Sequence, residues 1–335
     1  MVIPTLKQLR ASIPAHCFKS NVATSLVYLF VDLSRVFLSG LAIRNASQLT
    51  VISWPVYWGV QSVFFTGLWV IAHECGHGAF SKYNVLNDTI GCIIHSFLLV
   101  PYWSWKFTHS RHHQFTGHIQ NDQVFVPSIN EKQKWYHHSP IFRVLFVVSI
   151  LLFGWPLYLL FNTSGTKFGS HFIPSSRIFK SHEYFEVWAS NTILILTCLN
   201  MVCGFSLYTL LVYYGVPLVL TNAQLVAITL LQHTRHDVAF YNEDQWEFVK
   251  GALSTIDRDF GLLNYFHHHI SDTHICHHLF SKIPFYKAKE ATLHLRKVLG
   301  PLYRKDSRNV FEALYTDHYQ CFSVKDSGDG IFYFT

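Results

Sequence analysis

The chain has 335 residues, of which 50% are hydrophobic and 14% charged, and its formal net charge is +6 with histidine neutral. Ordinary soluble domains carry about 25% charged residues, so this composition argues against a soluble protein and points to a membrane. The sequence has no run of five or six like charges, so nucleic-acid binding is not indicated. The mild positive charge fits attraction to an anionic membrane surface instead.

Six apolar stretches follow an N-terminal segment, residues 1–21, that has no signal-peptide pattern and is expected to be cytosolic. A helix needs about 20 apolar residues to cross a bilayer, and the second stretch meets this most plainly. The third and fourth stretches carry polar or helix-breaking residues. In chain order the stretches are Val22–Ile43, Leu49–Ala72, Leu86–Trp103, Ile141–Phe161, Val187–Tyr213 and Val216–Leu231.

The first two stretches and the last two are predicted to cross the membrane as two hairpins, the second of which turns at Tyr214-Gly215. The far-side turns of these hairpins contain Arg44 and no other lysine or arginine, so both termini are expected on the cytosolic side. The third and fourth stretches are expected to lie in the interface, or to dip into the membrane and return. These features predict an all-α integral membrane protein with four transmembrane helices.

The largely polar residues 233–335 are predicted to form a cytosolic cap of helices and loops on the membrane region, residues 22–232. No internal repeat or low-complexity linker divides the chain. We therefore expect residues 1–335 to form a single domain.

Histidine is the outlier of the composition, with 22 residues against 20 for aspartate and glutamate together. Eight histidines form three clusters whose i, i+3 or i+4 spacing puts the rings of each cluster on one face of a helix. Imidazole binds iron, copper, zinc or nickel, and eight ligands are too many for one ion but suit two. The clusters are His73-Glu-Cys-Gly-His77, His109-Ser-Arg-His112-His113 and His274-Ile-Cys-His277-His278.

Other residues are candidates to complete or support this site. His233, at the end of the last apolar stretch, is a candidate ninth ligand, and His236 is a weaker alternative. One of His267, His268 and His269 is a candidate supporting residue. Metal-bound histidines need an acceptor for their second ring nitrogen. The acidic candidates near the clusters are Glu74, Asp122, Asp257, Asp259 and Asp272, the last of which could equally cap the third cluster's helix.

The three clusters and the segments around them resemble the membrane fatty acid desaturases, and in particular their microsomal Δ12 (oleate) and ω-3 branch. The resemblance covers nearly the whole chain. It rests on Ile13–Phe18, Ala72–Ser81, His95–Tyr102, Asp122–Pro127, Tyr213–Pro217, Thr255–Asp259 and Asp272–Phe280.

This resemblance implies a centre of two iron ions held by the eight clustered histidines together with His233. It also implies molecular oxygen as the oxidant and electrons that pass from NADH and its reductase through cytochrome b5. The implied location is the endoplasmic-reticulum membrane, and the implied substrate is an acyl chain esterified to a phospholipid.

The expected reaction is the introduction of a cis double bond into a lipid-linked acyl chain, most simply Δ12 desaturation of oleate to linoleate. An unactivated methylene has neither an acidic proton nor a leaving group, so side chains alone cannot attack it and a metal is required. Phe64, Phe65, Phe97 and Trp69 are candidate walls of an apolar tunnel for the chain.

Three alternatives remain open at this point. Gly78, directly after the first cluster, resembles the glycine of ω-3 enzymes and leaves an ω-3/Δ15 desaturase open. A hydroxylase or acetylenase could use the same scaffold. A histidine-rich metal transporter would instead hold its ligands at mid-membrane inside the spans.

Overall fold

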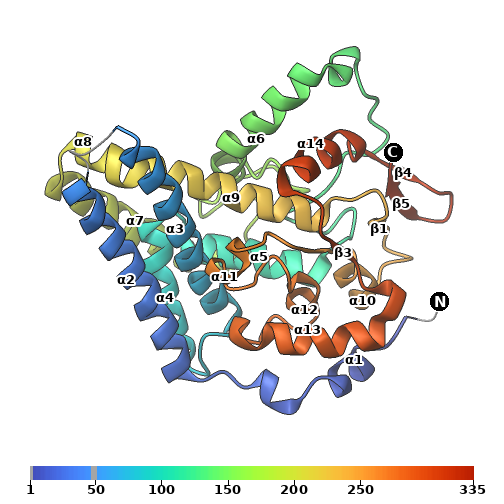
Figure 1. The fold of residues 1–335 in the computed structure, drawn as a ribbon. Helices are drawn as coiled ribbons and strands as arrows, with labels where there is room; N and C mark the ends of the chain where they lie inside the picture. The colour runs from blue at the N-terminus through green and yellow to red at the C-terminus, as the bar shows by residue number, and fades with distance from the viewer. Residues whose placement is uncertain (1–2, 47–50) are drawn as a thin grey trace.

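The computed structural model describes residues 3–46 and 51–335, and most of this part is helical. Figure 1 shows the long helices of residues 22–97 on one side and the shorter helices of the C-terminal region on the other, with the helix of residues 140–161 above them. The helices are α1 (Leu6–Ser12), α2 (Val22–Ala46), α3 (Ser53–His77), α4 (Asn84–Phe97), α5 (Tyr102–Phe115), α6 (Pro140–Phe161), α7 (Tyr184–Gly204), α8 (Leu207–Thr209), α9 (Val216–His233), α10 (Phe248–Ala252), α11 (Leu263–Phe266), α12 (His274–Leu279), α13 (Phe285–Leu299) and α14 (Val310–Gln320).

Two small sheets lie in the C-terminal region, so the expectation of a purely helical chain is wrong in this detail. One sheet has the antiparallel order β1 (Ala239–Tyr241), β5 (Ile331–Phe334), β4 (Val324–Asp326). The other pairs β2 (Asp257–Arg258) with β3 (Lys305–Asp306) in parallel. These strands form because the C-terminal segment folds back along the residues that follow α9, a pairing too short to leave an alternating pattern in the sequence.

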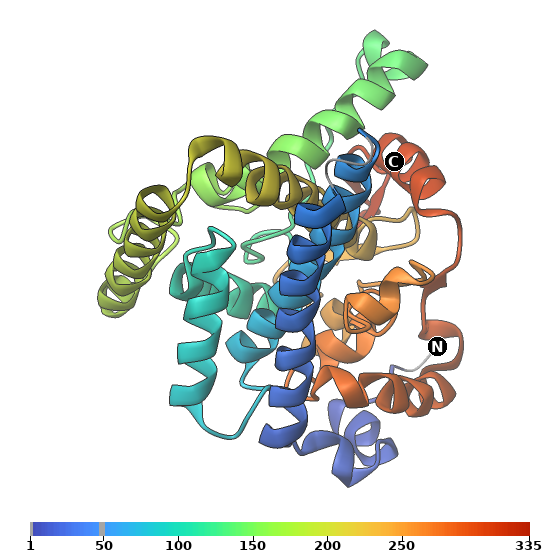
Figure 2. The same cartoon turned by 60° about the vertical axis from the view of Figure 1, so that its left-hand side comes forward.

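Five helical segments of the described residues are long and apolar enough to cross a membrane: Val22–Ala46, Ser53–His77, Pro140–Phe161, Ser181–Gly204 and Leu207–His233. The segment expected at 86–103 is instead the pair α4 and α5, which meet at a bend of 108°. Of the stretch expected to begin at Leu49, the first two residues lie outside the described part. Helix α6 is one uninterrupted helix that packs against α9 and α14 at the edge of the molecule (Figures 1 and 2).

The predicted turn at Tyr214-Gly215 is wrong. Helix α7 ends at Gly204, and Leu207–His233 runs on as one helical segment through a π-helical turn, Leu210–Gly215. Pro217 has no N–H to donate to the Tyr213 carbonyl, and the π-helical turn frees the Val212 carbonyl. The side chains of Tyr57 and Trp58 on α3 donate to these two carbonyls at 2.8 and 2.9 Å. The helix therefore continues where the sequence indicates a break.

Helix α3 is the central element, because it packs against α2, α4 and α9. Polar side chains join α3 to α9 inside the apolar layer: Gln224 Nε2 donates to Ser62 Oγ at 2.7 Å, and Thr221 Oγ1 donates to the Ser62 carbonyl at 3.2 Å. Such hydrogen bonds between membrane helices fix how the helices pack. The C-terminal turn of α3, which carries the first histidine cluster, is therefore held in the interior.

A buried ion-pair network fastens the C-terminal region to the end of α9. The Arg258 guanidinium donates to Asp306 and Asp317 at 2.6 and 2.5 Å, and to the Leu231 and Thr234 carbonyls at 2.6 and 2.9 Å. A buried charge is tolerated when each of its donors has a partner. The network therefore fixes the segment that leads to the third histidine cluster against the membrane helices.

The loop before the third cluster approaches α3 at Gly67. A Cβ added to Gly67 would lie 2.7 Å from the Phe266 carbonyl oxygen, which is backbone and cannot move alone. Gly67 is therefore the residue that lets this loop reach the membrane helices.

We expect Gly67→Ala to lower the free energy of unfolding by about 1–3 kcal/mol, because the added methyl overlaps backbone. Thermal unfolding of the detergent-purified protein measures this. Gly59→Ala is the matched control, since Gly59 lies on the same helix with nothing within 4 Å of an added Cβ. Equal melting temperatures for the two variants would contradict the role given to Gly67.

Candidate metal centre

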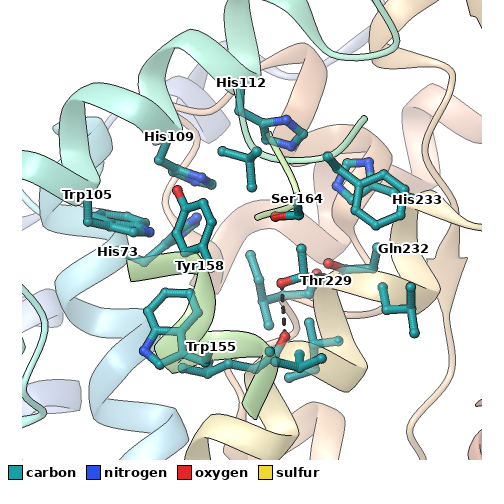
Figure 3. Close-up of a pocket in the computed structure, with 18 of the residues that line it drawn as sticks. His73, Trp105, His109, His112, Trp155, Tyr158, Ser164, Thr229, Gln232 and His233 are labelled. Atoms are coloured by element: carbon teal, nitrogen blue, oxygen red, sulfur yellow. Dashed lines mark hydrogen bonds between the residues drawn. The ribbon is translucent and has the colours of Figure 1, made fainter. Parts of the chain in front are cut away.

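The three histidine clusters converge in the interior although they lie far apart in the sequence. His73 and His77 end α3, the second cluster lies on α5, and the third cluster forms most of α12. His233 ends α9 and joins them. Figure 3 shows His73, His109, His112 and His233 around one cavity.

The nine histidines form two adjacent groups. The first group comprises His73, His77, His109, His113 and His277, and one ring nitrogen of each lies within 4.8 Å of the others. The second comprises His112, His233 and His278 on the same criterion. His274 joins the second group, since its Nε2 lies 3.2 Å from Nε2 of His233. The two groups touch, because the rings of His113 and His278 stack with centroids 4.1 Å apart.

The spacing of the ring nitrogens fits shared metal ions. Nε2 of His73 and His77 lie 3.3 Å apart, and Nε2 of His109 and His113 lie 3.2 Å apart. Two imidazoles bound to one ion at about 2.1 Å are separated by about 3.0–3.4 Å at right or tetrahedral angles. Nε2 of His277 and of His278 are buried without a hydrogen-bond partner among the described residues. Cations between the rings would satisfy these nitrogens.

Burial keeps these imidazoles in the form that binds metal. The pKa values of His274, His277 and His278 are lowered well below the ordinary value, first because burial disfavours the charged ring and then because neighbouring histidines repel a second proton. The three rings are therefore neutral at pH 7, with a lone pair available to a metal.

Two residues orient histidine rings of the site by a hydrogen bond to the ring's Nδ1. Asp122, a predicted supporting residue, lies with Oδ1 2.8 Å from Nδ1 of His112, which leaves Nε2 of that ring facing its group. Thr116 Oγ1 lies 3.0 Å from Nδ1 of His278. The sequence analysis missed Thr116, since a single threonine carries no spacing signal.

The other acidic candidates act elsewhere. Glu74 Oε1 lies 3.6 Å from Nδ1 of His73, too far for a hydrogen bond, and its Oε2 accepts from the Phe285 N–H at 3.0 Å. Asp257 accepts from the Ile275 N–H at 2.8 Å and so supports the first turn of α12. Asp259 is part-exposed and bonds to Gly261 and Asn264.

The remaining candidates lie outside both groups. Asp272 pairs with His269 at 3.0 Å rather than capping α12. His268 is buried against Asp32, a carboxylate inside the first long helix, and His236 is exposed. His233 rather than His236 is therefore the ninth clustered histidine.

An apolar cavity of about 270 Å³ ends on the histidines. His73, His109, His112, His233 and His274 line it, together with aromatic and aliphatic side chains of α5, α6 and α9. In Figure 3, His109, His112 and His233 lie at one end and Trp155 at the other. Two of its polar groups have backbone partners, since Thr229 Oγ1 donates to the Leu225 carbonyl and Gln232 Nε2 to the Ile270 carbonyl. Nε1 of Trp69, which also lines the cavity, has no hydrogen-bond partner among the described residues.

The expected aromatic walls are wrong in three cases out of four. Trp69 lines the cavity, but Phe65 and Phe97 pack against each other and Tyr214 in the core, and Phe64 packs against Phe266. Trp105, Trp155 and Tyr158 take their place. The helix faces that meet the cavity depend on how α5, α6 and α9 pack around α3.

Together, the helices apolar enough to span a membrane, the two histidine groups and the adjoining apolar cavity define a class of protein with a candidate metal site beside a cavity suited to an apolar ligand. Residues 52–307 match the family model described as fatty acid desaturase. A Δ12 fatty acid desaturase of Calendula officinalis is 42% identical over 98% of this chain and 91% of its own length. An endoplasmic-reticulum ω-6 fatty acid desaturase of Glycine max is 42% identical over 96% and 86%.

A third relative, an acyl-lipid (9+3)-(E)-desaturase of Dimorphotheca sinuata, is 41% identical over 98% of this chain and 91% of its own length. The chain belongs to the fatty acid desaturase family. The family resemblance found in the sequence is thereby confirmed, and the two histidine groups are the candidate metal site of the chain.

Asp122→Ala is expected to weaken metal binding by about 10–100-fold, because His112 loses the acceptor that orients its ring. Metal retained after dialysis against increasing chelator, measured by mass spectrometry, gives the affinity. Asp259→Ala is the control, since Asp259 contacts neither histidine group. Equal metal retention in the two variants would remove Asp122 from the site.

Proposed function

We propose that this protein is an oxygen-dependent acyl-lipid desaturase that introduces a cis double bond at the Δ12 position of a phospholipid-linked oleoyl chain, giving linoleate. The observation that carries the proposal is the apolar cavity that ends on both histidine groups. The Δ12 and ω-6 names of relatives at about 40% identity support the position of the double bond.

The donor set supports two iron ions as the cofactor. One would be held by His73, His77, His109, His113 and His277, and the other by His112, His233, His274 and His278. Bound iron supplies the oxygen activation needed to remove hydrogen from an unactivated methylene. Zinc, which has no redox chemistry, would not.

The chain's own residues bind and orient the substrate. The aromatic and aliphatic walls favour an acyl chain over water. The hydroxyl of Thr229 and the Nε2 of Gln232 already donate to backbone carbonyls. The length of cavity between Trp155 and the histidines then fixes which carbons lie beside the metal. Excluding water also protects the oxidant from side reactions.

The overall reaction needs an electron source. Removal of two hydrogens from the chain, with oxygen, two electrons and two protons, gives one double bond and two waters. The family resemblance supplies reduced cytochrome b5, with its NADH reductase, as the donor. The endoplasmic-reticulum name of the Glycine max relative supports the same membrane here.

The proposed topology has four crossings, formed by α2 with α3 and by α7 with the segment Leu207–His233, and α6 lies along the interface. Arg44 is the single basic residue of the far-side turns in sequence, which supports cytosolic termini and cytosolic histidine clusters. Residues 1–335 would form one domain.

The alternatives from the sequence are less well supported. No relative reported above is named as an ω-3 enzyme, hydroxylase or acetylenase. A metal transporter would hold its ligands within the spans, whereas six of the nine histidines lie on α5 and α12. The (E) geometry in the Dimorphotheca sinuata name makes product geometry part of the test.

Expression in a host that makes oleate but no polyunsaturated acids is expected to yield linoleate. Gas chromatography with double-bond location measures position and geometry, and His109→Ala at matched protein level is expected to abolish the product. A trans product, a product only when linoleate is fed, or a hydroxylated acid would each reassign the reaction. Absence of any new acyl product with cytochrome b5 supplied would refute the proposal.

Thr229→Phe is expected to lower linoleate formation at least about tenfold, because the larger side chain fills the cavity while the metal ligands are untouched. Val219→Phe is the control, since Val219 is 44% exposed on the same helix and lies outside the cavity. Metal content is expected to stay the same in both variants. Full activity of Thr229→Phe would show that the acyl chain lies elsewhere.

A further inference from the structure

The apolar cavity that is proposed to hold the substrate is called the acyl cavity below. A second hollow reaches the histidines without passing through it. It measures about 470 Å³ and lies among the residues before α2, the end of α3, the start of α4 and the residues before α13. His77 lines this hollow, and no residue lines both it and the acyl cavity. We call it the His77 hollow.

The rim of the His77 hollow is basic. Lys82, Lys106 and Lys282 line it, and Asp88 is its one acidic residue. Asp88 is already neutralised, because Lys106 Nζ lies 2.5 Å from Oδ1 and the Tyr102 hydroxyl donates to the same oxygen at 2.8 Å. Lys82 and Lys282 are exposed and form no ion pair with any residue in the described ranges. Two uncompensated positive charges therefore stand at this entrance.

His77 connects the hollow directly to the first histidine group. Its ring centroid lies 4.6 Å from that of His73, 4.5 Å from that of His113 and 4.7 Å from that of His277. An electron that arrives at the base of the hollow therefore crosses one imidazole to reach the centre. The acyl cavity cannot serve the same purpose, because the substrate fills it during the reaction.

We propose that the His77 hollow is the docking site of an acidic protein that carries single electrons, and that its electrons enter the centre through His77. This inference rests on the proposed function. Positive charge around a cleft steers a negatively charged partner and sets its orientation. Each docking oxidises the carrier by one electron and reduces the centre by one, so two dockings supply one double bond.

A second basic hollow of about 290 Å³ provides a comparison within the same molecule. Arg111, Lys167, Arg177 and Lys180 line it, but none of the nine clustered histidines does. Lys167 and Lys180 are exposed, like Lys82 and Lys282. Reversing two charges here changes the net charge equally but touches no route to the centre.

The test compares Lys82→Glu/Lys282→Glu with Lys167→Glu/Lys180→Glu in the full chain, purified in detergent with lipid. The first readout is the Kd of the soluble haem domain of cytochrome b5, which does not require turnover. We expect the first double variant to raise Kd at least about tenfold at low salt, and the second less than about twofold. The difference should shrink at 0.5 M salt, since screening shortens the reach of exposed charges.

The second readout is the rate at which the reduced haem domain is reoxidised at low concentration with oxygen and lipid present. It should fall in parallel with affinity in the first variant, at unchanged metal content. Equal effects of the two variants on Kd, an unchanged Kd in the first, or a raised Kd with an unchanged rate would each overturn the proposal. Linoleate formation in the host, without reoxidation of the haem domain by wild type, would overturn this docking site while leaving the proposed function intact.

Discussion

Nine imidazole rings from four separate segments lie together in the interior, and this arrangement constrains the rest of the structure. In three pairs of these rings the Nε2 atoms lie 3.2–3.3 Å apart. A neutral imidazole has one donor and one acceptor nitrogen, so rings crowded in this way cannot all satisfy both, and they are stable together when they share cations. The protein must also hold each ring at a fixed angle before an ion binds. Asp122 orients His112 and Thr116 orients His278, each by a hydrogen bond to the Nδ1 of the ring.

Helix α3 meets most of the demands that follow. It brings the first histidine cluster to the centre, bonds to α9 through Ser62, and satisfies the carbonyls of the π-helical turn through Tyr57 and Trp58. Gly67 on the same helix admits the loop that leads to the third cluster. The ion pairs of Arg258 fix the C-terminal region. Helix α12 is therefore positioned both by the loop that packs on Gly67 and by the segment that Arg258 anchors.

The histidine groups also separate two environments. On one side the acyl cavity is lined mainly by aromatic and aliphatic side chains, which suits a hydrocarbon chain and disfavours water. On the other side the His77 hollow is polar and basic. Since His73 lines only the first and His77 only the second, one turn of α3 divides the place for the substrate from the proposed entry for electrons.

The relatives show the family of the chain, but their names do not all describe the same product. Of two relatives of nearly equal identity, the Calendula officinalis enzyme has a name that gives the double-bond position alone, and the Dimorphotheca sinuata enzyme has a name that also gives (E) geometry. The metal site alone therefore does not specify the product. The shape of the cavity between Trp155 and the histidines is the physical feature that can, because it sets which carbons of a flexible chain reach the metal and in which conformation.

The sequence by itself determined the membrane character, the approximate positions of the long helices and all nine clustered histidines, because composition and the periodicity of a helix are local properties. It also identified Asp122. Tertiary structure alone decided that the nine rings form groups of five and four, that Thr116 supports one ring, and that Trp105, Trp155 and Tyr158 rather than Phe64, Phe65 and Phe97 meet the cavity. It also decided that the helix continues through Tyr214-Gly215, since Tyr57 and Trp58, more than 150 residues away in the chain, satisfy the carbonyls that the local sequence leaves free. These features depend on which helix faces meet, and no local pattern encodes that.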